Sequence, residues 1–416
     1  MASVSTKKID PIEIPYDFCG HQVPGIWRYL LPKEALEWKL PRESRSTCDD
    51  CPMACFHNYH PTYRCCAYHP IVPNFLLGLS LRNKTSTTAV KSLIKSGFLT
   101  PEGFQRTPSQ WIDYLADLSE DSPPDEMRVL CPILDKSSGL CNIYAFRNAV
   151  CSTFFCLNDH GDRGQQFWEA LEETVSHAES ALTQWALSEL GFDLKKYYKR
   201  LDKYAKAPLT VMDPKTRGWK ESVRKDLWGK HYGKELQLLK ACGDLIAENR
   251  DRLWEIASKQ EVMEASKFEK AQVRAVPKAY EDEIDPDDLE DTEEGESASL
   301  QELFDEAKKE YKKMWKVPSR VVLNPRAKIE PNPQDDKESK AFKNMPYVLK
   351  YLKKQGGKKY EWRQFISQET ADALTLMKKP KKADKISEKA PFKKIEEPEV
   401  FLAQWSSKKV LIKPNY

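Results

Sequence analysis

Two stretches of the chain carry apolar residues at the three- and four-residue spacings of amphipathic helices. The first begins near residue 162, and we expect it to end at Gly191 because glycine commonly terminates helices. The second runs from about Lys220 to Lys259, although Gly229 and Gly233 argue against an unbroken helix. The first apolar face comprises Phe167, Trp168, Leu171, Val175, Ala178, Leu182, Trp185 and Leu190, and the second Leu227, Trp228, Tyr232, Leu236, Leu239, Leu245, Ile246, Leu253 and Ile256.

Shorter elements are predicted around these two helices. Residues 86–118 read as two helical pieces with a break near Phe98, and residues 300–316 read as an isolated amphipathic helix. Residues 1–47 are different, because five prolines interrupt any long helix there. We expect that segment to wrap the region that follows it.

Charge is strongly segregated along the chain. The 416 residues carry 66 lysines and arginines and 63 aspartates and glutamates, a net charge of only +3. Residues 281–299 nevertheless contain eleven acids and no lysine or arginine, and residues 378–394 contain eight lysines and two acids. The first pattern is typical of a solvated linker. The second favours either a solvated basic tail or a tail that binds a polyanion.

The N-terminal residues contain no apolar region of a secretory signal, and no run approaches the length of a membrane span. Ala2, in place of glycine, excludes myristoylation. We therefore expect a cytoplasmic protein without a membrane partner. In that compartment clustered cysteines are more often metal ligands or catalytic thiols than disulfides.

Nine of the eleven cysteines fall in two short segments. The first segment is Cys48, Cys51, Cys55, Cys65 and Cys66, and the second is Cys131, Cys141, Cys151 and Cys156. Short spacings such as C-x2-C aim two thiolates at one ion, and ligands from a second segment close the site. We predict that the two segments meet and that these nine cysteines are the metal ligands. Cys19 is expected to be a small buried residue instead.

Nine sulfurs exceed one tetrahedral site, and the adjacent Cys65 and Cys66 diverge too strongly for both to reach one ion easily. Three arrangements stay open: two zinc sites, one four-cysteine iron–sulfur cluster with spare structural thiols, or a polynuclear iron site with additional ligands. Four histidines lie near the cysteines in sequence, although a lone histidine is more often a surface or core residue. They are His57, His60, His69 and His160.

The cysteine pattern resembles a known bacterial family. C-x2-C-x3-C…CC, followed by C-P-x-L…G-x-C-x-I-Y-x-x-R-x-x-x-C-x-x-F-x-C, is similar to the CxxCxxCC or YkgJ-like cysteine-cluster proteins, which are described as zinc- or iron-chelating. In the second segment the matching positions besides the cysteines are Pro132, Leu134, Ile143, Tyr144, Arg147 and Phe154. The chain departs from the family at Asn148, where proline is usual, and at Ser152, where arginine is frequent. The interval before the paired cysteines is also longer than in the compact motif.

The resemblance implies metal binding through these cysteines and does not imply one reaction. A related branch resembles flagellin lysine-N-methylases, which makes a metalloenzyme an alternative. No G-x-G-x-x-G sequence follows a predicted strand to support a Rossmann-type cofactor site. A further alternative is an interaction protein in which the metal is purely structural.

We therefore predict a mainly α protein, in which an irregular cysteine-rich metal-binding module packs against amphipathic helices. The expected parts are a domain at 1–278 with its cysteine module at 48–160, an acidic linker at 279–299, and a largely disordered basic tail with short helices at 300–416. The expected cofactor is zinc or iron, the latter as an ion or a 4Fe–4S cluster. Apolar anchors in the tail, such as Phe392 and Trp405, favour docking to a protein partner. Nothing beyond the basic tail supports a nucleic-acid partner.

Overall fold

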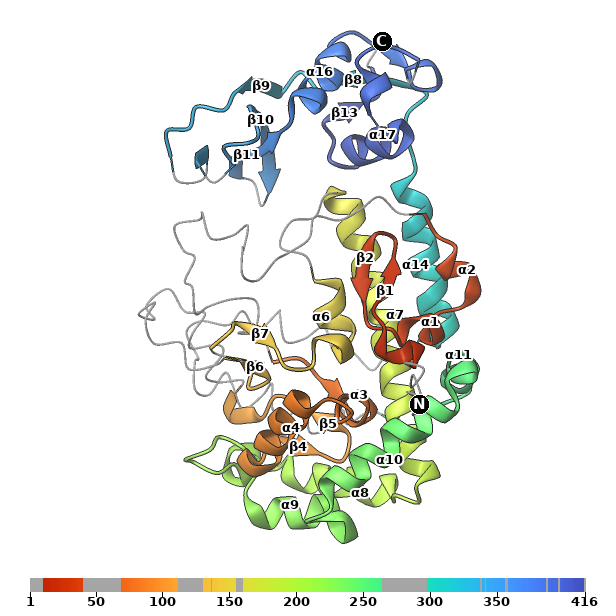
Figure 1. Ribbon diagram of the computed structural model, residues 1–416, viewed down its shortest axis with the longest axis vertical. Helices are drawn as coiled ribbons and strands as arrows, with labels where there is room; N and C mark the ends of the chain where they lie inside the picture. The colour runs from red at the N-terminus through yellow and green to blue at the C-terminus, as the bar shows by residue number, and fades with distance from the viewer. Residues whose placement is uncertain are drawn as a thin grey trace, which may run out of the picture. The chain divides into compact units, whose positions relative to one another are not determined.

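The computed structural model describes residues 10–39, 69–110, 130–135, 137–154, 160–263, 298–336, 339–340, 342–355, 358–386, 388–395 and 397–414. The chain divides into two compact units. The first comprises the described residues of Met1–Trp38, His60–Phe154 and Glu172–Phe304, and the second those of Lys39–Tyr59, Phe155–Leu171 and Asp305–Tyr416. Helices α7 (Gly161–Glu189) and α14 (Leu300–Met314) contribute residues to both units. Figure 1 shows the helices and strands of both units.

The first unit is built mainly from helices and small antiparallel sheets. Its other helices are α1 (Trp27–Leu30), α2 (Lys33–Leu36), α3 (Asn74–Ser80), α4 (Lys84–Ser96), α6 (Ala149–Thr153), α8 (Leu194–Tyr204), α9 (Glu221–Trp228), α10 (Glu235–Glu248) and α11 (Leu253–Ser258). Its strands are β1 (Tyr16–Phe18), β2 (His21–Val23), β3 (Val72–Pro73), β4 (Leu99–Thr100), β5 (Gly103–Phe104), β6 (Leu134–Asp135) and β7 (Leu140–Cys141). They form a β1–β2 hairpin, a three-stranded sheet of order β3-β5-β4, and a β6–β7 hairpin.

The longest predicted helix is confirmed. Helix α7 covers the expected stretch, and Gly191 follows it with φ +69°, a left-handed conformation that glycine adopts readily. The prediction of one helix from Lys220 to Lys259 is wrong, because the chain there forms α9, α10 and α11 in succession. Gly229 and Gly233 both have positive φ, which interrupts the helix between α9 and α10.

The predicted helical piece that begins near residue 86 is also confirmed. Helix α4 begins after Asn83, whose side chain accepts hydrogen bonds from the Thr85 and Ser86 N–H groups. It ends at Gly97, which has φ +77° and marks the predicted break. Most of the second predicted piece lies outside the described residues.

Helix α3 forms the closest helix contact of the first unit. All seven of its residues are buried, and it packs against α10. A Cβ atom added to Gly78 would lie 1.9 Å from the Leu239 carbonyl oxygen of α10, and one added to Gly243 would lie 2.6 Å from the Leu79 nitrogen. The two backbones therefore meet at a pair of glycines, which only residues without a Cβ atom permit.

The second unit contains the remaining described strands, β8 to β13. Strand β8 (Arg320–Leu323) lies between β12 (Lys381–Lys382) and β13 (Leu411–Ile412). A second antiparallel sheet has the order β11-β10-β9, formed by β9 (Ala327–Pro331), β10 (Tyr347–Gln355) and β11 (Lys358–Ile366). Helices α16 (Gln368–Leu376) and α17 (Pro398–Ser407) complete the unit. Figure 1 shows these elements together near the C-terminus.

The region predicted as a largely disordered tail is therefore folded over most of its length. One hydrophobic cluster joins residues from both of its sheets and both helices, including Val321, Leu349, Leu374, Trp405 and Leu411, each at most 3% exposed. Exposed lysines between these positions obscure the periodicity of the apolar residues in the sequence. The apolar residues come together only when strands distant in sequence pair. Arg163, near the start of α7, donates hydrogen bonds to the Lys313 and Lys316 carbonyls at the end of α14.

Helical residues outnumber strand residues throughout the described ranges, so the prediction of a mainly α protein is confirmed. The structure does not test whether that protein is built on a metal-binding module. Among the described helices, none is sufficiently long and apolar to cross a membrane.

The glycine contact between α3 and α10 gives a stability prediction. Replacing Gly78→Ala forces a methyl group against the α10 backbone, which cannot move aside as a flexible side chain can. Overpacking of this kind costs about 1–3 kcal/mol of unfolding free energy, measurable by urea titration. The control is Ser188→Thr, which adds one carbon at an exposed site on α7 and is expected to change stability by less than about 0.5 kcal/mol. Equal stability of the two variants would contradict the close packing.

Candidate metal centre

The second cysteine segment begins with a short hairpin. Strands β6 and β7 pair so that Leu134 lies opposite Cys141. The Leu134 N–H donates to the Cys131 carbonyl at 3.0 Å, which places Cys131 one turn before β6. The Asn142 N–H donates to the Ile133 carbonyl at 3.1 Å and extends the pairing. Cys131 and Cys141, ten positions apart in sequence, are therefore brought to the same end of one hairpin.

Asp135 fixes the turn of this hairpin. Its carboxylate accepts hydrogen bonds from the Ser137 N–H at 3.0 Å, the Ser137 hydroxyl at 2.8 Å and the Ser138 hydroxyl at 2.7 Å. These bonds, that from Ser138 first, lower the pKa of Asp135 below its usual value. Gly139 completes the turn with φ +70°. The loop predicted between the two cysteines is thus held by a defined set of hydrogen bonds.

Helix α6 carries Cys151 and is capped by Asn148. The Asn148 side-chain oxygen accepts a hydrogen bond from the Cys151 N–H at 3.2 Å, and its amide group donates to the Ile71 carbonyl at 2.8 Å. Asn148 is therefore the N-cap of α6. Ser152 is 1% exposed and donates to the Asn148 carbonyl at 2.8 Å.

The β1–β2 hairpin holds the same segment from the N-terminal side. His21 Nε2 lies 3.0 Å from the Ser152 carbonyl, and Arg147 Nη2 donates to the Gln22 carbonyl at 2.6 Å. The Arg147 guanidinium also lies 4.0 Å from the centre of the Tyr144 ring, at a distance typical of a cation–π contact. The N-terminal segment therefore contacts the cysteine region, as predicted from its position in the sequence.

Glu179 on α7 is buried and accepts a hydrogen bond from the start of α6. It is 3% exposed, and its Oε2 accepts a hydrogen bond from the Ala149 N–H at 3.2 Å. Burial raises the pKa of Glu179 to about 8, and the nearby Glu172 adds to this rise, while the Ala149 hydrogen bond opposes it. The carboxyl group is therefore mostly protonated at neutral pH.

Of the nine predicted ligands, three lie in described parts of the chain. Cys131 is buried, Cys141 is half-buried and Cys151 is exposed. The other six lie outside the described residues, namely Cys48, Cys51, Cys55, Cys65, Cys66 and Cys156. Within the described ranges no three histidine, cysteine or acidic side chains are grouped as a metal site. The structure thus positions three members of the predicted ligand set, and the convergence of all nine stays a prediction.

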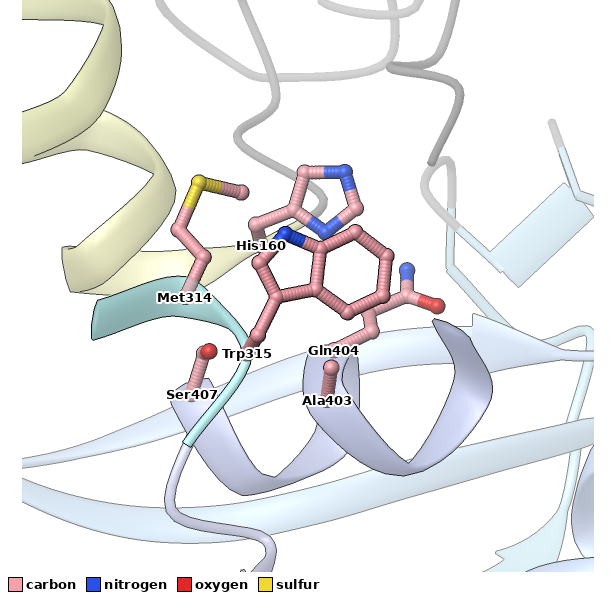
Figure 2. Close-up of a pocket in the computed structure, with 6 residues that line it drawn as sticks. All are labelled: His160, Met314, Trp315, Ala403, Gln404 and Ser407. Carbon is pink, nitrogen blue, oxygen red and sulfur yellow. The ribbon is translucent and has the colours of Figure 1, made fainter. Parts of the chain in front are cut away.

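Of the four histidines near the cysteines in sequence, His69 and His160 lie in described parts of the chain. His69 Nε2 lies 3.0 Å from the Leu130 carbonyl, directly before Cys131 in sequence. His57 and His60 lie outside the described residues. His160 belongs to the second unit and lines a small pocket with Met314, Trp315, Ala403, Gln404 and Ser407 (Figure 2). None of the nine cysteines lines this pocket, so it is not the predicted centre.

The two cysteines outside the clusters have separate surroundings. Cys242 on α10 is fully buried, and burial raises the pKa of its thiol to about 12. Cys19 occupies the turn of the β1–β2 hairpin with φ +54° and donates from its sulfur to the Trp38 carbonyl at 3.4 Å. Cys19 is half-buried instead of fully buried, which corrects the expectation made for it.

Two supporting residues, His21 and Glu179, were not predicted from the sequence. Glu179 did carry a signal, because it falls on the apolar face of α7, four positions after Val175 and next to Ala178. An acid on such a face is forced into the core. His21 carried none, since 131 positions separate it from the Ser152 carbonyl it contacts.

Comparison of the chain with protein-family models, with curated proteins and with solved structures finds no match.

Glu179 gives a pH-dependent prediction. The folded chain holds its proton up to about pH 8, whereas a carboxyl group in the unfolded chain releases it near 4.5. Between these values the folded state binds more protons, so the free energy of unfolding falls as pH rises, by on the order of 3 kcal/mol up to pH 7. Glu179→Gln keeps an oxygen for the Ala149 N–H and removes this contribution.

We therefore expect Glu179→Gln to be more stable than the parent chain at pH 7 and to lose part of its pH dependence in urea titrations. Glu173→Gln, at an exposed site on the same helix, is the control and is expected to follow the parent chain. Parallel pH profiles for the parent and Glu179→Gln would contradict a protonated Glu179.

Proposed function

We propose that the chain binds a metal ion, zinc or iron, through the cysteines of its two segments. The supporting observation is the way the second segment is built. Cys141 lies on a hairpin whose turn is fixed by Asp135, and Cys151 lies on a helix whose first turn is capped by Asn148. Two independent sets of hydrogen bonds thus determine the backbone positions of two candidate ligands.

A fixed backbone favours metal binding because ordering the ligands in advance lowers the entropy lost when the ion binds. The anchoring extends beyond the segment, since Arg147, Ser152 and Ala149 each bond to an element distant in sequence. This region is irregular in secondary structure and nevertheless holds several buried apolar residues, among them Ile133, Ile143 and Phe146.

The environments of the cysteines also separate candidate ligands from a structural thiol. Metal ligation requires the thiolate form. Cys242 is disfavoured as a thiolate because burial raises its pKa to about 12, whereas Cys141 and Cys151 are partly or largely accessible. This contrast assigns packing to Cys242 and leaves Cys141 and Cys151 available as ligands, whereas the buried Cys131 is proposed as a ligand from its place in the cluster.

The identity of the bound metal is determined on protein purified without oxygen. An iron–sulfur cluster gives a brown preparation with visible absorbance, whereas a zinc site gives a colourless one with stoichiometric zinc by elemental analysis. A preparation with neither metal, which also takes up neither when they are supplied under reducing conditions, would overturn the proposal.

The assignment of ligands gives a third prediction. Replacing Cys141→Ser together with Cys151→Ser removes two thiolates that serine hydroxyls do not replace, because a hydroxyl stays protonated at neutral pH. We expect metal affinity to fall by more than about 10-fold, since loss of even an outer hydrogen-bond partner of a ligand costs that much. The measurement is metal content per chain after equilibration with a competing chelator.

The control is Cys242→Ala, which is expected to keep the metal content of the parent chain while losing stability through a cavity in α10. Circular dichroism of the double serine variant then distinguishes two possible roles of the metal ion. Unfolding on loss of metal indicates a structural ion, whereas a folded chain without metal indicates an ion that serves binding or chemistry. Unchanged metal content in the double variant would exclude Cys141 and Cys151 as ligands.

A further inference from the structure

The lysine-rich residues 378–394 are not part of a solvated tail, because they belong to the folded second unit. Seven of the eight lysines are exposed, and Lys381 is half-buried. Between them, Ile386 and Phe392 are at most 1% exposed and belong to the hydrophobic cluster of the unit. Only Ser387 of this segment lies outside the described residues. We call residues 378–394 the basic segment.

Backbone hydrogen bonds hold the basic segment along its length. Lys381 and Lys382 form β12 and pair with Val321 and Arg320 of β8. The Ala383 N–H donates to the Ser319 carbonyl at 3.0 Å, and the Lys394 N–H donates to the Pro391 carbonyl at 2.9 Å. The Phe392 ring packs edge-on against Phe401 of α17 at 5.3 Å. The lysines are thus displayed from a fixed backbone.

Acids offset the charge of the basic segment only in part, since Glu369 interacts electrostatically with Lys394. None of its eight lysines forms an ion pair with a described acidic side chain, in contrast to Lys350, whose Nζ lies 2.9 Å from Glu330 on the neighbouring strand. The segment itself contains only two acids, Asp384 and Glu388. Residues 318–414 as a whole carry 23 lysines and arginines against 12 aspartates and glutamates.

Concentrated positive charge on a fixed surface favours a polyanion, because binding releases the counterions condensed around that partner. The charges here are lysines, which contact phosphate as point charges and do not read planar groups as arginine does. Such contacts position a nucleic acid without selecting its sequence.

A membrane surface fits the basic segment less well. Helices and loops that lie on a bilayer insert exposed apolar side chains next to their basic residues. In the basic segment the large apolar residues are buried in the unit's own core instead. Among the described side chains of the second unit, only Met345 and Leu352 are large, apolar and exposed, and neither belongs to the basic segment.

We propose that the basic segment of the second unit binds the phosphodiester backbone of a nucleic acid, without sequence selectivity. The function is separate from metal binding, since it uses neither the cysteines nor the elements that position them. RNA and DNA share the phosphate chemistry that carries the proposal, and the experiment below compares them.

The test measures fluorescence anisotropy of short labelled probes of mixed sequence, one single-stranded RNA and one DNA duplex, with the full chain at several salt concentrations. We expect micromolar binding of at least one probe, weakening steeply with salt. The variant carries Lys378→Gln, Lys379→Gln, Lys393→Gln and Lys394→Gln, which keep a polar side chain and remove four charges. Its affinity is expected to fall at least about 10-fold, with a shallower dependence on salt, because fewer phosphates are contacted.

The matched control removes four exposed lysines of the first unit, with Lys195→Gln, Lys196→Gln, Lys199→Gln and Lys206→Gln, so that the net charge changes equally. It is expected to bind as the parent chain does. Circular dichroism checks that both variants are folded. The proposal fails if neither probe binds, or if the two variants lose affinity equally. It also fails if vesicles of phosphatidylserine and phosphatidylcholine bind through the basic segment while both nucleic acids do not.

Discussion

The first unit depends on the burial of α3, a seven-residue helix with no exposed face. Its approach to α10 requires glycine at both contact points, Gly78 and Gly243, because any side chain there would collide with the opposite backbone. At its start, the Asn74 amide donates to the Pro101 carbonyl at 3.0 Å and to the Thr183 carbonyl of α7 at 3.4 Å. The same helix also contacts the turn at Tyr144–Phe146. Helix α3 therefore packs against both the helical core and the cysteine region.

This arrangement explains how an irregular segment keeps a defined shape. The hairpin and α6 are too short to be stable alone, because few hydrogen bonds form for each residue that is fixed. Their stability comes from side chains that reach other elements: Arg147 to β2, Asn148 to the residue before β3, and Glu179 from α7. The burial of Glu179 costs free energy at neutral and higher pH, which the surrounding packing offsets.

Sequence periodicity predicted the elements whose determinants are local. The apolar spacing located α7, and Gly97 and Gly191 marked helix ends because their positive φ is a property of one residue. The fold of residues 318–414 could not be predicted in this way. Leu323 reaches its environment only by pairing with Leu411, 88 positions away, and Leu349 only through neighbouring strands. In the candidate site, the spacing of the cysteines identified the candidate ligands. The contact of His21 with Ser152 could not be predicted from spacing, because the two residues are 131 positions apart and meet only in the folded chain.

Asn148 and Ser152 together start and hold the helix that carries Cys151. Proline before a helix restricts φ and has no N–H group to satisfy, so it starts a helix by limiting the unfolded chain. Asn148 starts α6 by accepting the Cys151 N–H instead, and its amide group ties the helix to Ile71. Ser152 then donates a hydrogen bond to the Asn148 carbonyl. The N-cap, the bond from Ser152 and the His21 contact therefore act together to fix the turn that carries Cys151.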